Sequence, residues 1–247
     1  MKRIFLFLMV AVLAASACTK KVSSEKLVVD LANHFDKNGD RYTEQLAAVA
    51  PEKRAGFIMV KLDKDLKADD LWTLDFGETD PSGQVVVAEF PSRNKEAHLS
   101  LISACLDDPE ACSAVLDVLD AFKQSKIHPA MTLRAVFYDG GESGTAGMKA
   151  LYDDLLQSYE TATFDIEVTT CDTIPARTFI IEEKSVFAKQ MIEVIPEYLK
   201  PVGQVNFEMG EFPRQDWPTR IPTYRYRLGN DRIADLKLLT AFTLLVN

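Results

Sequence analysis

The sequence predicts an α/β fold in which helices flank a mixed, mostly parallel sheet, preceded by an N-terminal helical segment. From residue 84 onward, short apolar runs typical of strands alternate with longer stretches of helical periodicity. The run from Val85 to Ala88 is continuously apolar, as expected of a strand buried on both faces. A hydrophobic content of 47% with 11 Gly and 11 Pro is ordinary for a globular protein, and the length favours a single domain over residues 26–247.

Helices are expected throughout residues 26–75. Residues 24–35 place apolar side chains on one helical face, a second helix is expected over residues 43–50, and a third begins with Pro51 in its first turn. The sequence leaves open whether this segment covers the sheet or forms a separate helical module.

Strands and helices alternate in residues 83–247. The predicted strands cover residues 84–90, 132–138, 162–169, 177–182, 204–208 and 223–227. The predicted helices cover residues 94–106, 146–159, 186–199 and 233–244, and another starts at Asp107-Asp108-Pro109-Glu110. Because ligand sites in such sheets lie at the carboxyl ends of strands, a site is expected in the turns after Phe90, Tyr138 and Thr169.

The first seventeen residues are expected to be a signal peptide. A basic start at Lys2 and Arg3 precedes an apolar run too short to span a bilayer, and small residues 15–17 lead into Cys18. This resembles a bacterial lipoprotein signal, although Ala15 stands where Leu is usual. The resemblance implies cleavage before Cys18, a lipid such as palmitate on its sulfur, a polar tether over residues 18–25, and membrane anchoring in the cell envelope, at the outer membrane or its periplasmic face. An ordinary secretory signal with an incidental cysteine is the alternative.

The charge of the chain limits its partners. Loss of Lys2 and Arg3 with the signal changes the formal net charge from −9 to −11. A strongly acidic chain argues against nucleic acid and against electrostatic attraction to anionic lipid. A peptide, a glycan or a protein is the expected kind of ligand.

Three cysteines follow Cys18, namely Cys105, Cys112 and Cys171. An exported protein can keep disulfides, and an odd number leaves at least one thiol outside an intramolecular bond. Cys105 and Cys112 can pair only if the chain turns between them, because seven residues of one helix separate them by about 10 Å. The sequence leaves this pairing open.

One turn carries a family resemblance. Residues 138–144 read Tyr-Asp-Gly-Gly-Glu-Ser-Gly, and they resemble the aromatic-Asp-Gly-Glu-Glu turn of zinc aminopeptidases and glutaminyl cyclases. In that family the first Glu moves protons and the second binds metal, so Glu142 stands at a metal position and Gly141 at the position of the base. The resemblance implies a three-layer zinc-exopeptidase core over residues 83–247.

Other family positions are also altered. Residues 89–92 stand in place of a His-aromatic-Asp-Ser turn, with Glu89 in place of the His. Asp107 resembles the metal-binding Asp at the next helix start, and Asp165 or Glu167 resembles a later carboxylate. The stretch 216–223 resembles the segment that carries the last His, and it contains none. The resemblance therefore makes Glu89, Asp107, Glu142 and Asp165 vestigial metal-site positions.

The chemistry of these residue types argues against catalysis. A catalytic zinc usually takes three protein ligands, commonly including His, whereas an all-carboxylate set favours Mg, Mn or Ca. His128 precedes a strand whose length is about 26 Å, which places it at the far end of the sheet from Glu142. Gly141 cannot act as a general base, a role that typically contributes about 10²–10⁴-fold. We expect no catalytic residue, no bound metal and no cofactor.

The acids and glycines of these turns also have structural interpretations. Asp107 and Asp108 are suited to capping a helix, and Gly140 and Gly141 suit a tight turn. Near the C-terminus, residues 214–227 form an aromatic-basic segment, which is unusual in an acidic protein. It provides the candidate binding residues Trp217, Arg220, Tyr224 and Arg225. Packing of an edge strand with solvated arginines is the alternative for that segment.

The sequence thus favours an envelope-anchored lipoprotein with a non-catalytic, zinc-aminopeptidase-like domain that acts by binding. One alternative is an active metal-dependent peptidase or cyclase that uses Glu89, Asp107, Glu142 and Asp165 as ligands, and only there does zinc enter as a cofactor. Another is an unrelated binding lipoprotein whose site is the aromatic-basic segment.

Overall fold

The computed structural model describes residues 24–77, 83–92, 98–140, 146–171, 175–182, 186–210 and 221–247. Four of the predicted site residues lie outside these ranges, namely Cys18, Glu142, Trp217 and Arg220.

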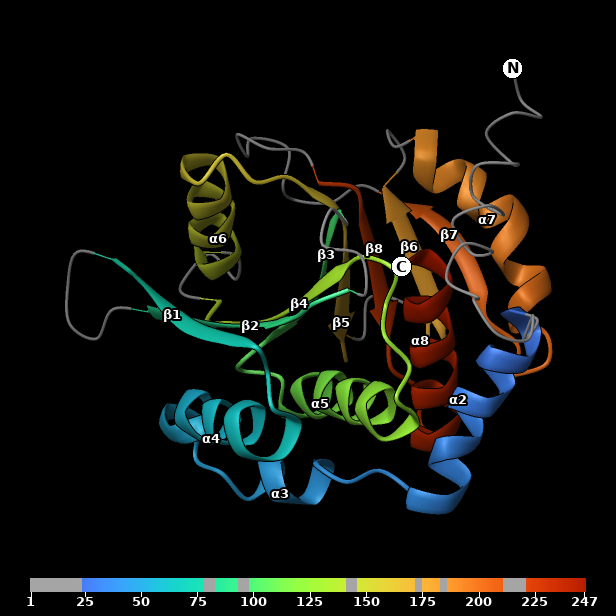
Figure 1. Ribbon diagram of the computed structural model, residues 1–247, viewed down its shortest axis with the longest axis horizontal. Coiled ribbons are helices and arrows are strands. Elements are labelled where there is room, and N and C mark those ends of the chain that lie inside the picture. The colour runs from blue at the N-terminus through green and yellow to red at the C-terminus, as the bar shows by residue number, and fades with distance from the viewer. Residues whose placement is uncertain are drawn as a thin grey trace.

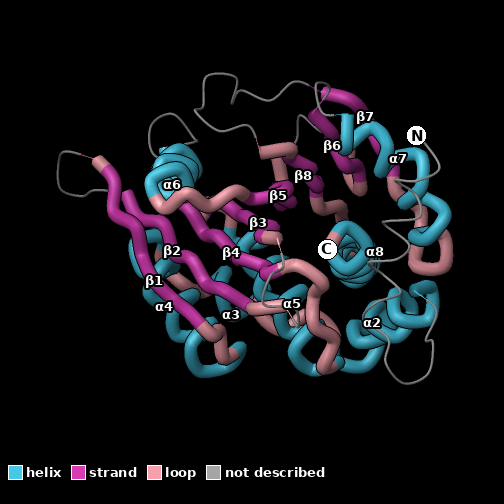
Figure 2. The backbone as a smooth tube through the Cα atoms, turned by 45° about the horizontal axis from the view of Figure 1, so that its top comes forward, coloured by secondary structure: helices cyan, strands magenta, loops and turns pink. Residues whose placement is uncertain are grey.

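One eight-stranded sheet runs through the described part of the chain in the order β1-β2-β4-β3-β5-β8-β6-β7 (Figures 1 and 2). The strands are β1 (Asp70–Phe76), β2 (Gly83–Phe90), β3 (Leu99–Cys105), β4 (Thr132–Tyr138), β5 (Ala162–Thr169), β6 (Thr178–Glu182), β7 (Asn206–Gly210) and β8 (Thr223–Arg227). The central strands β4, β3, β5 and β8 are mutually parallel, whereas β1–β2, β2–β4 and β6–β8 are antiparallel pairs. The sheet is mixed, as predicted.

Helices cover both faces of this sheet. They are α2 (Ser24–Asn38), α3 (Thr43–Ala47), η1 (Pro51–Lys53), α4 (Arg54–Val60), η2 (Lys61–Leu66), α5 (Pro109–Ser125), α6 (Ala146–Gln157), α7 (Val186–Leu199) and α8 (Arg232–Val246). Figures 1 and 2 show α6 on one face and the layer of α2, α3, α4, α5 and α8 on the other. None of the described helices is both long enough and apolar enough to cross a bilayer.

Strand β2 shows why the sheet is buried on both faces. Val86 and Ala88 belong to the large core cluster on the α5 side, whereas Val85 and Val87 belong to a smaller cluster that includes α6 residues. Successive side chains of a strand point to opposite faces, so a continuously apolar run fills both layers.

The predicted helix over residues 94–106 is wrong, because residues 99–105 form β3 in the middle of the sheet. Six of its seven residues are buried, and it lies between two parallel strands. A short apolar run cannot be assigned to helix or strand from periodicity alone. Residues 70–76 likewise form the edge strand β1 instead of continuing the helical segment.

The prediction that the turn after Phe90 shares an edge with the other candidate turns is also wrong. β2 runs antiparallel to β4, and Phe90 lies opposite Leu133 at the start of β4. The end of β2 is therefore at the opposite edge of the sheet from Tyr138.

Candidate functional site

The parallel strands β3, β4, β5 and β8 end at one edge of the sheet, called here the carboxyl edge. Cys105 at the end of β3 lies opposite Tyr138 at the end of β4, and Thr169 at the end of β5 lies opposite Arg227 of β8. Helix α5 starts four residues after Cys105. This edge is where an α/β sheet usually holds its ligand.

Asp108 joins two elements at this edge. Its Oδ1 accepts a hydrogen bond from the Ala111 N–H (2.9 Å), which caps α5 as the sequence predicts. Its Oδ2 accepts from the backbone N–H (2.8 Å) and the hydroxyl (2.7 Å) of Thr170, directly after β5. Both carboxylate oxygens are thus engaged in fixing the start of α5 to the end of β5. The neighbouring Asp107 is exposed, with its Oδ2 4.0 Å from the Cys105 sulfur.

Glu167 of β5 is buried and is held by two neighbouring strands. Its Oε1 accepts a hydrogen bond from the Tyr138 hydroxyl of β4 at 2.9 Å. Its Oε2 accepts from Nε (3.1 Å) and Nη2 (2.9 Å) of Arg225 on β8. A buried carboxylate is costly unless a cation and hydrogen bonds compensate it, and Arg225 supplies that cation here.

Asp165 and Glu89 lie away from the carboxyl edge. Asp165 is fully buried, accepts a hydrogen bond from the Ser103 hydroxyl at 2.8 Å, and lies opposite Leu101 in the first half of β3. Cys105 is four positions after Leu101, which corresponds to about 13 Å along the strand. Glu89 lies opposite Arg134 in the first half of β4 and accepts from its Nε at 2.8 Å.

The four vestigial metal-site positions are therefore not gathered at one point. Glu89 and Asp165 lie about 13 Å along the strands from the carboxyl edge at which Asp107 lies, and Glu142 is outside the described residues. Within the described ranges, no group of three or more His, Cys, Asp or Glu side chains could hold a metal ion.

The order of the strands changes which residues lie near the carboxyl edge. β3, and not β2, leads into the Asp107 turn, so Cys105 at its end lies near Asp107, whereas residues 89–91 lie toward the opposite edge of the sheet. On β5, Glu167 lies closer to the carboxyl edge than Asp165. Cys105 was not among the predicted site residues, because its segment was predicted to be a helix. An apolar run that ends two residues before an Asp was a signal that could have identified this strand end.

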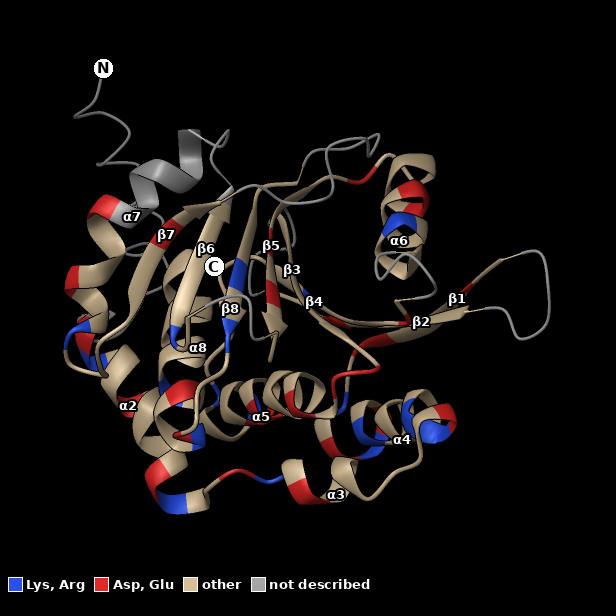
Figure 3. Ribbon diagram, turned by 180° about the vertical axis from the view of Figure 1, so that it is seen from behind, with Lys and Arg blue, Asp and Glu red and all other residues tan. Residues whose placement is uncertain are grey.

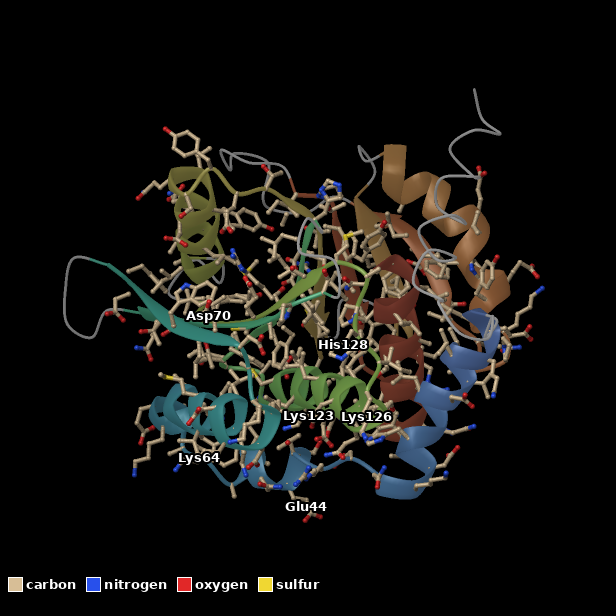
Figure 4. All side chains as sticks on the ribbon, in the orientation of Figure 1. Glu44, Lys64, Asp70, Lys123, Lys126 and His128 are labelled. Carbon is tan, nitrogen blue, oxygen red and sulfur yellow. The ribbon has the colours of Figure 1, made fainter. Side chains whose placement is uncertain are left out.

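All three histidines of the chain are described, and none lies at the carboxyl edge. His98 directly precedes β3, and its carbonyl accepts the N–H of Thr132 at the start of β4. His128 precedes β4 and lies beyond the end of α5, beside Lys126 (Figure 4). His34 lies on α2, with Nε2 3.9 Å from Asp120 on α5. The carboxyl edge therefore has no imidazole.

The described cysteines are thiols. Cys105 and Cys112 are not bridged, and the Cys112 sulfur donates to the Cys105 carbonyl at 3.1 Å. Burial raises the pKa of the Cys105 thiol to about 11 and that of Cys112 well above its ordinary value. A thiol that stays protonated at neutral pH is a weak nucleophile and a weak metal ligand.

The described part of the aromatic-basic segment belongs to β8, which is an interior strand and not an edge strand. Tyr224 is fully buried on the α5 side, with its ring 6.0 Å from that of Phe164 and 5.2 Å from that of Phe242. Tyr224 was predicted as a candidate binding residue, but its side chain is part of the core. Arg225, one residue on, points to the opposite face and pairs with Glu167.

The residues described at the carboxyl edge do not fit a catalytic zinc ion. Asp108 and Glu167 are engaged with protein partners, no histidine of the chain lies there, and Arg225 adds a positive charge. Zinc sites need free anionic or imidazole donors.

No family model and no curated protein matches the sequence, but solved structures share its fold. The Legionella pneumophila LapA aminopeptidase is 12% identical, with a TM-score of 0.63 over 93% of this chain and 77% of that one. An exopeptidase of Bacteroides vulgatus assigned to the zinc-dependent class is 15% identical, with a TM-score of 0.63 over 88% and 94%. An Acidobacteriales glutaminyl cyclase is 10% identical, with a TM-score of 0.61 over 93% and 97%. The chain therefore has the α/β fold of zinc-dependent exopeptidases and glutaminyl cyclases, at an identity that shows the fold alone.

Proposed function

We propose that this chain is a non-catalytic binding protein built on the zinc-exopeptidase fold and anchored in the bacterial envelope by a lipid on Cys18. The observation that carries the proposal is the pair of Glu167 and Arg225 at the carboxyl edge. A guanidinium takes the place that a metal cation would need beside that carboxylate.

Electrostatics supports this interpretation. A divalent cation next to Glu167 would face the positive charge of Arg225, whose side chain is only 21% exposed and thus weakly screened. The Tyr138 hydroxyl already donates to the other oxygen of Glu167. A metal would have to displace both partners before it could bind.

The remaining machinery of hydrolysis is also altered. The sequence has Gly141 where the resembled family has its proton-transferring Glu, and none of the three histidines of the chain lies at the carboxyl edge. A carboxylate-only site of Glu89, Asp107, Glu142 and Asp165 requires these side chains to meet, and the strand register separates Glu89 and Asp165 from Asp107. The active-hydrolase alternative therefore has no geometric support from the described residues.

The proposed ligand is a peptide or a protein segment that contacts the carboxyl edge. The similar structures are named as aminopeptidases, exopeptidases and glutaminyl cyclases, and the ligand class is proposed by analogy with that fold. The anionic composition makes cationic or neutral peptides the better probes.

Two experiments test the proposal. Aminopeptidase and glutaminyl cyclase assays on purified, zinc-supplemented protein should show no turnover, with LapA and the Acidobacteriales glutaminyl cyclase as the respective positive controls. Turnover by this chain would refute the non-catalytic assignment. Metabolic labelling with palmitate should modify the wild-type chain and leave Cys18→Ser unlabelled. Equal labelling of both would refute the anchor while leaving the first result unaffected.

A further inference from the structure

A second cluster of charged side chains lies far from the carboxyl edge, where the turn after α2 meets α5 and α8. Acidic and basic residues come together in this region of the helical layer (Figure 3). Its titratable and charged members are His34 of α2, Asp40, Arg41 and Tyr42 of the turn, Asp117 and Asp120 of α5, and Arg232 of α8.

Asp117 is the centre of this cluster and is 2% exposed. Its Oδ1 accepts the backbone N–H of Arg41 at 2.9 Å, so the turn after α2 is attached directly to it. Its Oδ2 lies 3.3 Å from Nη2 of Arg232. That guanidinium is shared, because Nη2 also donates to the Ser113 hydroxyl at 2.7 Å and Nη1 to the Glu110 carbonyl at 3.0 Å.

Asp120 lies one helical turn away and is 4% exposed. It accepts from Nη1 of Arg41 at 3.2 Å and from the side-chain amide of Gln124 at 3.4 Å. His34 approaches the same carboxylate from α2, and burial lowers its pKa although Asp120 opposes the shift. His34 is therefore neutral at pH 7 and does not neutralise Asp120.

The charges of the cluster do not balance when every acid is ionised. The three carboxylates of Asp40, Asp117 and Asp120 face the two guanidinium groups of Arg41 and Arg232. One proton restores neutrality. Burial raises the pKa of Asp117 to about 7, against the opposing effects of the Arg41 N–H and Arg232, and Asp40 adds to the rise. Asp117 is thus the group that takes up this proton.

We propose that the cluster is a proton-sensitive clamp, which holds the turn after α2 on α5 and α8 when Asp117 is protonated and loosens when that proton is lost. Lifting the turn exposes Asp117 to water, where its pKa returns to that of an ordinary aspartate, about 3.9. The closed state therefore binds more protons than the open state between about pH 4 and pH 7, and the opening constant rises by up to about tenfold per pH unit in that window. It is constant above about pH 7. If the chain is anchored as proposed above, this clamp fixes the first helix after the anchor.

Hydrogen exchange of residues 36–47 tests the clamp, after correction for the intrinsic pH dependence of exchange. In the wild type, the opening constant should rise by up to about tenfold per unit from pH 5 to pH 7 and then level off. Asp117→Asn should remove this slope. Asp36→Asn is the matched control, because Asp36 lies in the last turn of α2, is exposed and pairs with Lys237, and it should keep the wild-type slope.

A wild-type profile without a slope, or an unchanged slope in Asp117→Asn, would overturn the proposal. Carboxyl NMR titration of the wild-type chain gives an independent reading should Asp117→Asn fail to fold. An apparent pKa near 7 for Asp117 would support the clamp, and a value near that of a free aspartate would overturn it. Neither measurement depends on the presence or absence of catalysis or of the lipid.

Discussion

The Arg225 guanidinium lies 2.9 Å from the Glu167 carboxylate, across two neighbouring parallel strands and 58 residues apart in sequence. This contact places a fixed positive charge near the carboxyl edge of the sheet. A structure that shares the fold is named as a zinc-dependent exopeptidase. The protein neutralises a buried acid with its own side chain.

Removal of Arg225 alone should be strongly destabilising. Arg225→Met leaves Glu167 buried without its cation, and breaking such a pair typically costs about 3–5 kcal/mol of unfolding free energy. The double variant Glu167→Gln/Arg225→Met removes both charges and should recover most of that loss. Urea denaturation measures both values, and a single variant within about 0.5 kcal/mol of wild type would show that the pair carries no charge compensation.

The two adjacent aspartates at the start of α5 should behave differently. Asp108→Ala removes the cap of α5 and the bonds to Thr170, and should lower the free energy of unfolding by about 2 kcal/mol. Asp107→Ala is the matched control, because Asp107 is exposed, and should change it by less than about 0.5 kcal/mol. Thermal unfolding compares the two variants. Equal losses of unfolding free energy would contradict the assignment of Asp108 as the residue that links the start of α5 to the end of β5.

The hydroxyl of Tyr224 should be dispensable. It is buried and has no hydrogen-bond partner among the described residues. Tyr224→Phe removes this desolvated polar group and should leave the protein as stable as wild type or more stable by about 1 kcal/mol. Capture of a peptide ligand should be unchanged as well, because Tyr224 faces the core. A loss of ligand capture without a loss of stability would show that Tyr224 contributes to binding.

The thiols should react in the order of their exposure. Cys171 is exposed and should react first with a thiol reagent at pH 8, whereas Cys112 is buried and should react only on unfolding. In a Cys171→Ser variant, the reaction of Cys105 should accelerate about tenfold per pH unit up to its raised pKa of about 11. Mass spectrometry of labelled peptides assigns the sites. A plateau for Cys105 near pH 8 would contradict the effect of burial on its pKa.

Global stability should also depend on Asp117. Its pKa is about 7 in the folded state and that of an ordinary aspartate when unfolded, so the folded chain binds the extra proton between these values. The stabilisation is present in full at about pH 4 and is lost as pH rises to about 7, on the order of 1 kcal/mol per pH unit. Urea titrations from pH 5 to pH 8 should show this fall in wild type and a smaller one in Asp117→Asn.

The sequence predicted those elements whose signals are local. β4, β5, β8 and α7 have the predicted bounds, because each is an apolar run or stripe between clear breaks. The segment containing β3 was misassigned, because its apolar residues fit either period and only the neighbours β4 and β5 decide that they form a strand. The antiparallel direction of β2 likewise depends on pairing with β4, and it displaced Glu89 from the site.

The candidate site was predictable only in part. Asp108 as a cap follows from the spacing to Pro109, a local signal. Its bonds to Thr170, and the bonds of Glu167 to Arg225, join residues 62 and 58 positions apart and depend on the order of the strands. No pattern along the chain determines that order, so sequence reasoning gave the candidate acids without their partners.

The zinc content of the purified chain, after incubation with excess zinc and gel filtration, tests whether the fold holds a metal here, with the zinc-dependent exopeptidase of Bacteroides vulgatus measured beside it by mass spectrometry. We expect far less than one zinc ion per chain, because Arg225 and Tyr138 already engage Glu167 and no imidazole lies at the carboxyl edge. One or two tightly held zinc ions per chain would contradict this expectation.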